Sequence, residues 1–253
     1  MTVQAYAPPA DLIHLVRRFL VLRSAQRTLN TLLPTSGVTL VFRVSGAIFE
    51  AATLPSSPLP PLVVTGPRDF PRSVIYGPGT LAYVVELVPG AAQGLVGGAL
   101  EDLWGTTVAA REVLPLAPDL EEALRGAPGD VEALGILAEV VRSRAGAPAH
   151  RLVAEAASLL ARVPPTLSVR QLVDSLGTNK DSLEKRFRRD WGATPKVVLR
   201  IERLRGLIAS WGPEETWADR AHRWGYSDQS HFNHEFRSML GMAPGEFVRG
   251  DRW

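Results

Sequence analysis

One stretch near the C-terminal end carries a dense group of side chains that could do chemistry: WGYSDQSHFNHEFRSMLGMAPGEF, residues 224–247. Its polar side chains include Gln229, His231, Asn233 and His234. Amides of this kind can pair with two atoms of an adenine edge, and closely spaced histidines are zinc ligands. Phe232, Phe236 and Leu240 recur every four residues, which is typical of a helix with one buried face. The polar side chains therefore lie on a helix whose other faces can meet a ligand.

The same pattern occurs once before in the chain, so it is an internal repeat. SVRQLVDSLGTNKDSLEKRFRRDWGATP (168–195) aligns with TWADRAHRWGYSDQSHFNHEFRSMLGMAP (216–244). Gly177 and Gly225 align at an offset of 48, whereas three later pairs align at 49: Phe187/Phe236, Gly192/Gly241 and Pro195/Pro244. The second copy therefore has one extra residue in its turn.

Each copy predicts a short helix, a glycine turn and a second helix. Ser168 with Gln171 forms a capping box at the first helix, and Thr216 with Asp219 approximates one. The second helices bury equivalent stripes, namely Leu183, Phe187 and Trp191 in copy one and Phe232, Phe236 and Leu240 in copy two. Two helices joined in this way form a helix-turn-helix, whose second helix can lie in the major groove of DNA.

Residues off these stripes, near the start of each second helix, are the candidate base readers, because that end reaches base edges. They are Asp181, Ser182, Glu184 and Lys185 in copy one, and Gln229, Ser230, Asn233 and His234 in copy two. A carboxylate can accept from the cytosine amino group, and a lysine can donate to guanine. Candidate phosphate contacts are Thr178, Lys180, Arg188 and Ser227. For a single helix of this kind a solvated face is the favoured explanation, but duplication of the whole unit strongly favours DNA.

Residues 148–249 resemble the DNA-binding domain of AraC/XylS-type transcription regulators. The segment GYSDQSHFNHEFRSMLGMAPGEF is similar to the C-terminal signature of that family, and KRFRRDWGATPKVVLRIERLR to its linker region. Arg220 stands where the family usually has an aliphatic residue. The resemblance implies two helix-turn-helix units joined by a long helix over about 195–210, which enter successive major grooves. It also implies double-stranded DNA and RNA polymerase as partners.

The first half of the chain predicts strands rather than helices. TLVFRV (39–44), PLVVTG (61–66), RSVIYG (72–77) and LAYVVELV (81–88) are typical strands bounded by turns, while LIHLVRRFLVL (12–22) fits a helix or a strand. YAPPADLIHLVRRFLVLR, LPTSGVTLVFRVSG and LEDLWG resemble an uncharacterised domain often joined to this DNA-binding domain. Such domains commonly bind small effectors or form homodimers, often on a cupin-like barrel.

The expected fold is therefore α+β, in three parts. Residues 1–115 form a β-rich, cupin-like sensor or dimerisation domain, and 116–147 form a helical connector. Residues 148–253 form the DNA-binding domain. That part is also the more basic one, because residues 151–253 hold 17 Lys and Arg against 13 Asp and Glu, a balance of +4, whereas residues 1–150 have a balance of −2. This distribution favours a polyanionic partner.

Composition argues against several other classes. The chain has no cysteine, which excludes disulfides and thiolate catalysis, and residues 15–149 contain no histidine for a metal cupin. A zinc site at His222, His231 and His234 is disfavoured because the helix is better explained as a DNA reader. No P-loop or esterase motif occurs. We expect no enzyme activity, cofactor or metal, no secretory signal or membrane span, and a location in the cytoplasm.

The sequence therefore predicts a sequence-specific, double-stranded-DNA-binding transcription regulator that responds to an effector through its N-terminal domain. The rival hypothesis is a ligand-binding or enzymatic N-terminal module whose helical tail mediates protein contacts. Duplex binding distinguishes the two. The effector-binding residues are unknown from the sequence.

Overall fold

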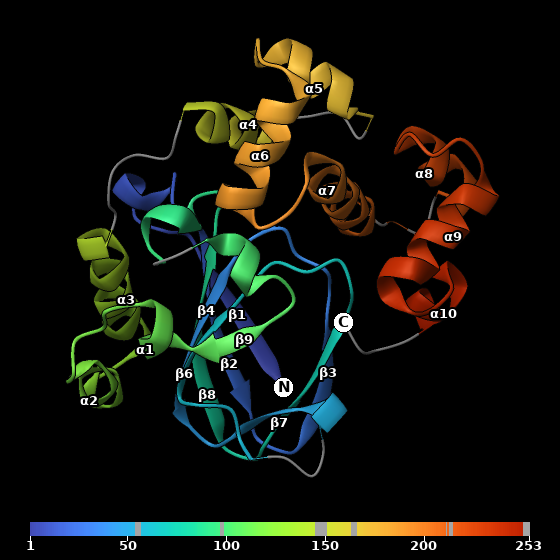
Figure 1. Cartoon of the computed structure of the whole chain (residues 1–253). Coiled ribbons are helices and arrows are strands. Elements are labelled where there is room, and N and C mark those ends of the chain that lie inside the picture. Colours follow the sequence, from blue (N-terminus) through green and yellow to red (C-terminus); the bar gives the residue numbers. More distant parts are fainter. Residues whose placement is uncertain are drawn as a thin grey trace.

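The computed structural model describes residues 1–53, 57–96, 99–144, 151–162, 166–210, 212 and 215–249. Within this part of the chain, a strand-rich N-terminal half is followed by helices alone (Figure 1). The expectation of a β-rich domain followed by a helical domain is confirmed. The expected boundary between residues 147 and 148 lies outside the described residues.

The N-terminal half contains two antiparallel sheets. In the described residues the larger sheet has the strand order β1-β2-β8-β4-β6-β9, and the smaller has the order β3-β7-β5. The strands are β1 (Thr2–Tyr6), β2 (Val16–Ser24), β3 (Thr28–Leu32), β4 (Thr39–Ser45), β5 (Ile48–Glu50), β6 (Leu62–Thr65), β7 (Arg72–Tyr76), β8 (Thr80–Leu87) and β9 (Thr107–Ala109). The four strands expected after residue 38 are all present.

Strand β2 settles the ambiguity over residues 12–22. A 3₁₀ turn at Ala10–Leu12 comes first, and the strand then pairs with β8 from Val16↔Leu87 to Ser24↔Thr80. Its other edge pairs with β1. These residues form a strand because they pair with a neighbouring strand on each side, and no local sequence pattern could show that pairing.

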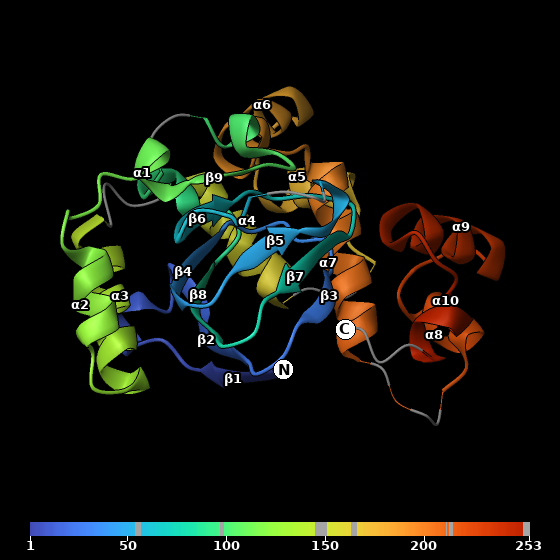
Figure 2. The same cartoon turned by 90° about the horizontal axis from the view of Figure 1, so that it is seen from below.

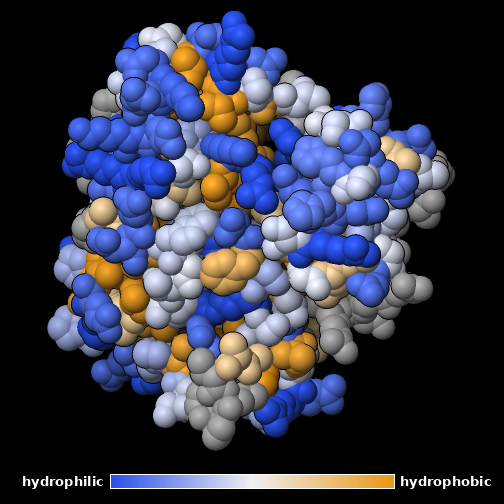
Figure 3. Space-filling view, turned by 45° about the vertical axis from the view of Figure 1, so that its right-hand side comes forward, coloured by the Kyte–Doolittle hydropathy of each residue, from blue (hydrophilic) through white to orange (hydrophobic). Residues whose placement is uncertain are grey.

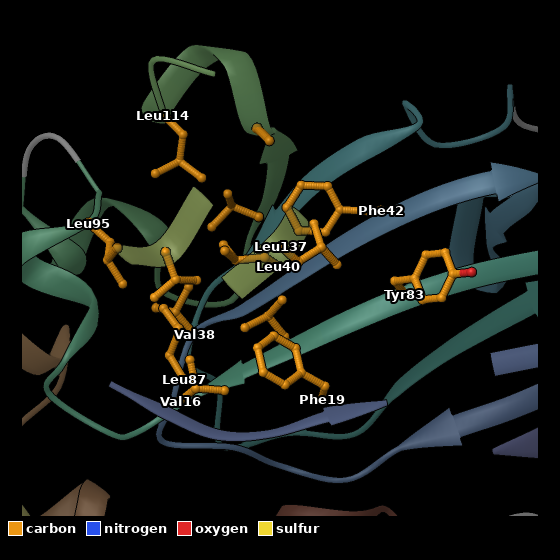
Figure 4. Close-up of a cluster of buried hydrophobic side chains, with 14 of the residues drawn as sticks. Val16, Phe19, Val38, Leu40, Phe42, Tyr83, Leu87, Leu95, Leu114 and Leu137 are labelled. Carbon is orange, nitrogen blue, oxygen red and sulfur yellow. The ribbon is translucent and has the colours of Figure 1, made fainter. Parts of the chain in front are cut away.

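Alternating side chains of the sheets build two apolar layers. Phe19 and Val21 of β2 point into the large N-terminal core, while Leu22 points the other way and packs with Val74 and Tyr76 of the smaller sheet. Figure 4 shows the N-terminal core, in which strand residues such as Phe42 meet Leu114 and Leu137 from beyond the sheet. The larger sheet is therefore covered on both faces.

Three helices complete the N-terminal core: α1 (Ala110–Val113), α2 (Leu120–Gly126) and α3 (Asp130–Arg144). Leu120, Leu124, Leu137 and Val141 of α2 and α3 belong to that core. Asp130 at the start of α3 accepts hydrogen bonds from Arg23 (2.6 Å) and the Tyr83 hydroxyl (3.1 Å). Helices α2 and α3, which lie within the expected connector, thus pack on the sheet, on the side away from α7 and α9 (Figure 2).

The C-terminal helices follow the order that the repeat predicts. They are α4 (Arg151–Arg162), α5 (Val169–Ser175), α6 (Lys180–Trp191), α7 (Pro195–Ala209), α8 (Trp217–Arg223), α9 (Gln229–Leu240) and α10 (Pro244–Arg249). We call α5 with α6 unit 1, and α8 with α9 unit 2. Each unit has its own hydrophobic core, and α7 contributes to both: Val198 to the core of unit 1, and Ile201, Leu204 and Leu207 to that of unit 2.

Candidate nucleic-acid interface

The second helix of each unit is the one expected to read DNA, and we call it the reading helix. That of unit 1, α6, is defined at both ends by local interactions. Asn179 caps its start, because its side-chain oxygen accepts from the Ser182 N–H at 2.9 Å. Gly192 ends it in the left-handed conformation at φ 73°, where glycine carries no Cβ penalty. Leu183, Phe187 and Trp191 are completely buried, as the stripe predicts. The other faces of its first two turns are left for a ligand.

The reading helix of unit 2, α9, repeats this construction with one change. Its cap is Asp228, whose carboxylate accepts from the His231 N–H at 2.7 Å. Gly241 ends the helix at φ 71°, and Phe232, Phe236 and Leu240 are buried. Four residues separate α5 from α6 and five separate α8 from α9. The extra turn residue expected from the alignment is therefore present.

The candidate base readers all lie on the first two turns of α6 and α9. Those with exposed side chains are Asp181, Ser182, Lys185, Gln229, Ser230 and His234, whereas Glu184 and Asn233 are partly buried. The two helices thus present similar polar surfaces, and unit 2 forms a mostly hydrophilic lobe in Figure 3. Their role as base readers stays a prediction.

The candidate phosphate contacts differ in their surroundings. Thr178 and Ser227 lie in the turns, and Lys180 opens α6 with an exposed side chain. The Ser227 hydroxyl donates to Asp228 at 3.0 Å. Arg188 lies one turn beyond the readers, with its guanidinium 3.5 Å from the Glu101 carboxylate and 3.6 Å from that of Glu184. A phosphate at this position would compete with two carboxylates for the same guanidinium.

A buried polar network, which sequence reasoning missed, connects unit 2 to α7. Glu235 of α9 accepts from Arg200 of α7 at 3.2 Å and from the Tyr226 hydroxyl at 3.2 Å. Burial and the neighbouring carboxylate raise the pKa of Tyr226. The signal was the spacing: Glu235 falls three residues after Phe232, on the edge of the buried stripe. A charge at that position must have a partner.

Arg220 and Trp224 form a second polar connection between unit 2 and the end of α7. Arg220 is 1% exposed and donates to the backbone carbonyls of Ser210 and, at 3.1 Å, of Gly212. Its guanidinium also lies 3.2 Å from Glu215. The Trp224 indole N–H donates to the Ser210 hydroxyl at 3.2 Å and its ring covers Gly206. Arg220, where an aliphatic residue is usual, therefore satisfies carbonyls that directly follow α7.

A cleft opens between the two halves of the chain. Its volume is about 950 Å³, and its apolar walls include Leu33, Leu199 and Trp224. Its charged residues include Arg17, Glu202 and Arg205. Glu202 accepts from the Ser36 hydroxyl and lies 3.6 Å from Arg17, while Arg205 donates to the Pro34 carbonyl at 3.0 Å. Polar contacts across the domain boundary therefore line the cleft.

The described residues contain no group of three His, Cys, Asp or Glu side chains placed to hold a metal ion. Among the helices in this part of the chain, none has the length and apolar character needed to cross a membrane.

Comparison with protein families finds one match, to a helix-turn-helix domain over residues 172–250. The C-terminal helices form an AraC-type helix-turn-helix domain. The resemblance noted in the sequence is thereby confirmed, and it supports a DNA-binding transcription regulator. No curated protein matches the chain.

Several solved structures resemble the chain at low sequence identity. ToxT from Vibrio cholerae is 12% identical and has a TM-score of 0.51, with 98% of each chain covered. ToxT bound to (E)-4-(8-methylnaphthalen-1-yl)but-3-enoic acid gives a TM-score of 0.49 at 12% identity, covering 98% of this chain and 99% of that one. CdpR from Pseudomonas aeruginosa gives a TM-score of 0.33 at 17% identity, covering 69% of this chain and 47% of that one. The first likeness, with both chains covered almost completely, shows that the fold of the whole chain occurs in a known structure.

Proposed function

We propose that this chain is a sequence-specific regulator of transcription that binds double-stranded DNA. One observation carries the proposal: two helix-turn-helix units each expose the polar first turns of a reading helix. The basic balance of residues 151–253 supports it, because phosphates attract Lys and Arg. The three-part division at residues 115 and 147 goes with this proposal, as do the base readers and phosphate contacts named above.

The two units are joined closely enough to read neighbouring segments of one duplex. Helix α7 has 15 residues and therefore spans about 22 Å at 1.5 Å per residue. Successive major grooves on one DNA face lie about 34–36 Å apart, a distance that two reading helices flanking α7 can cover. We expect a DNA site with two elements about 10 bp apart.

We further propose that a small-molecule effector binds in the cleft between the domains. The volume is at the upper end of that of ordinary ligand sites, and apolar walls with a few charged groups are typical of them. Arg17 and Arg205 suit an effector with an apolar body and an anionic group. Because the walls come from both domains, an occupant would change how they sit together and so change DNA binding. Contact with RNA polymerase and homodimer formation remain proposals that follow from the regulatory role.

Selection of bound sequences from random duplex DNA, with the full chain, tests the DNA-binding function. We expect an enriched two-element site whose affinity falls as salt rises, because bound cations are released from the phosphates. Arg188→Ala should lower affinity for all DNA sequences equally. It should also reduce the slope of log affinity against log salt concentration by about one. Arg125→Ala is the matched control, since that exposed arginine lies on α2 and pairs with Glu121. No enriched sequence, with the chain folded, would support the rival interaction module.

The effector proposal has its own test. Carboxylic acids with apolar bodies are screened for a rise in melting temperature and for a change in affinity for the selected DNA site. Ala209, which is exposed and lines the cleft, is changed to Phe to narrow it. We expect Ala209→Phe to abolish both effects while leaving DNA binding without ligand intact. A ligand response that survives this substitution would place the effector elsewhere.

A further inference from the structure

The segment Leu100–Gly105, here called the η4 segment, is fixed firmly in the N-terminal domain. Leu100 and Leu103 are buried in the N-terminal core, at 1% and 4% exposure. The Gly105 N–H donates to the Pro67 carbonyl at 2.8 Å. The Leu103 carbonyl rests directly on Gly66, where any side chain would collide with it. This segment therefore moves only if the domain that carries it moves.

The opposite side of the η4 segment supports the end of α6, as the green chain below that helix in Figure 1 indicates. A Cβ atom at Gly192 would lie 2.5 Å from the Leu100 carbonyl oxygen, so the two backbones are in close contact. Glu101 lies 3.5 Å from Arg188 of α6. A Cβ at Gly90 would likewise lie 3.3 Å from Trp191. Unit 1 is thus positioned directly against the N-terminal domain.

Trp104 extends from this segment to the junction of the two units. It packs against the core of unit 1 and also against the core of unit 2, which are otherwise separate clusters. Among the described residues, Val197 in the first turn of α7 is the other one that packs beside both cores. Trp104 is partly buried and packs at the joint between the units, from outside the DNA-binding domain.

We propose that Trp104 is a positioning residue that sets the spacing between the two DNA elements this regulator prefers. The inference rests on the DNA-binding function proposed above. A side chain wedged between two cores limits how far the units can approach or rotate, because close-packed interiors tolerate little change in volume. One added base pair moves the second element by about 3.4 Å and turns it by about 35°. A fixed joint should therefore lower the affinity for a site with a longer or shorter spacer, although Trp104 itself contacts no base.

The test measures affinity of the full chain for the selected site with its spacer lengthened or shortened by one and two base pairs. We expect the unaltered chain to lose about tenfold per base pair, similar to one mismatched base pair. Trp104→Ala should reduce this loss to about threefold or less, with the same preferred bases in each element. Trp104→Leu, which retains apolar volume, should give an intermediate profile and replaces the alanine variant if that does not fold.

Phe70→Ala is the matched control, because Phe70 is an exposed aromatic residue beside Gly105 of the same segment. It should keep the spacing profile of the unaltered chain. If Trp104→Ala and Trp104→Leu lower affinity equally at every spacing, or if Phe70→Ala broadens the profile too, the positioning role is wrong while the DNA-binding function stands. If the unaltered chain selects no two-element site, the proposed function fails as well.

Discussion

Units 1 and 2 share one fold but are anchored in different ways. Both have a reading helix of 12 residues, a capped start, a glycine end and a buried stripe. Unit 1 rests on the N-terminal domain through the η4 segment. Unit 2 is attached chiefly to α7, through Glu235 and Arg220, and meets the N-terminal domain at Leu33 and Trp104.

Aligned positions show how the difference arises. Glu235 of α9 aligns with Arg186 of α6, and Met239 with Asp190, both at the offset of 49. In unit 1, Arg186 and Asp190 pair with each other within one helix. In unit 2, Met239 is buried in the core and Glu235 pairs with Arg200 of α7. The repeat thus preserves the apolar stripe, while the charges beside it determine what each unit is attached to.

The largest expected effect tests whether unit 2 can unfold separately from the N-terminal domain while unit 1 cannot. Phe187→Ala and Phe236→Ala each remove a fully buried ring and should cost about 3–5 kcal/mol. Phe236→Ala should open unit 2 alone, because few apolar contacts connect it to the N-terminal domain. Phe187→Ala should also weaken the contact with the η4 segment. Amide hydrogen exchange, measured element by element, distinguishes these outcomes.

Phe70→Ala serves as the surface control for these two core variants, and it should change the free energy of unfolding by no more than about 0.5 kcal/mol. Loss of protection over the whole chain in both core variants would contradict the difference in anchoring.

A smaller effect tests whether both units read bases. Lys185→Ala and Asn233→Ala should each cost about 1–3 kcal/mol at one preferred base and relax specificity there. The two losses should fall in different elements of the site, because the residues lie on different reading helices. Affinities for single-base variants, at two salt concentrations, give the answer. A uniform loss across sequences would mean that these side chains touch phosphates only, and the reading role would pass to neighbours such as Asp181, Ser230 or His234.

The smallest expected effect concerns the N-terminal caps of the two reading helices. The cap of α9 is a carboxylate, which titrates, whereas the cap of α6 is an amide, which does not. The pKa of Asp228 is held below its ordinary value, first by the hydrogen bond from the His231 N–H and then by the Ser227 hydroxyl. Its cap is therefore fully effective above about pH 4, the range of an unfolded aspartate, and is lost as pH falls through the lower folded pKa. Asn179, the cap of α6, has no such transition.

In acid, the first turn of α9 should therefore lose hydrogen-exchange protection at a pH where that of α6 is retained. Asp228→Asn keeps an acceptor for the cap and should remove the difference. A carboxyl of Asp228 that titrates at or above its ordinary value by NMR would show that the cap does not favour the charged form.

The sequence alone determined the features that depend on neighbours within about one helical turn. The stripes of Phe187 and Phe236, the cap at Ser168 and the turn glycines follow from helix periodicity and from backbone conformations that glycine tolerates. The four strands between residues 39 and 88 were predicted because alternation and bounding turns are local too. The base readers could be named by the same reasoning, since an exposed face is the complement of a buried one.

Only the tertiary structure decided which distant groups meet. Residues 16–24 became a strand because β1 and β8 pair with both edges, and Glu235 became a buried anchor because Arg200 and Tyr226 satisfy its charge. Arg220 could be buried because the chain just after α7 offers it carbonyls. Trp104 lies 93 residues before Val197 in the chain, yet both fill one joint between the two units. Contacts of this kind depend on how whole elements pack, and no local spacing encodes them.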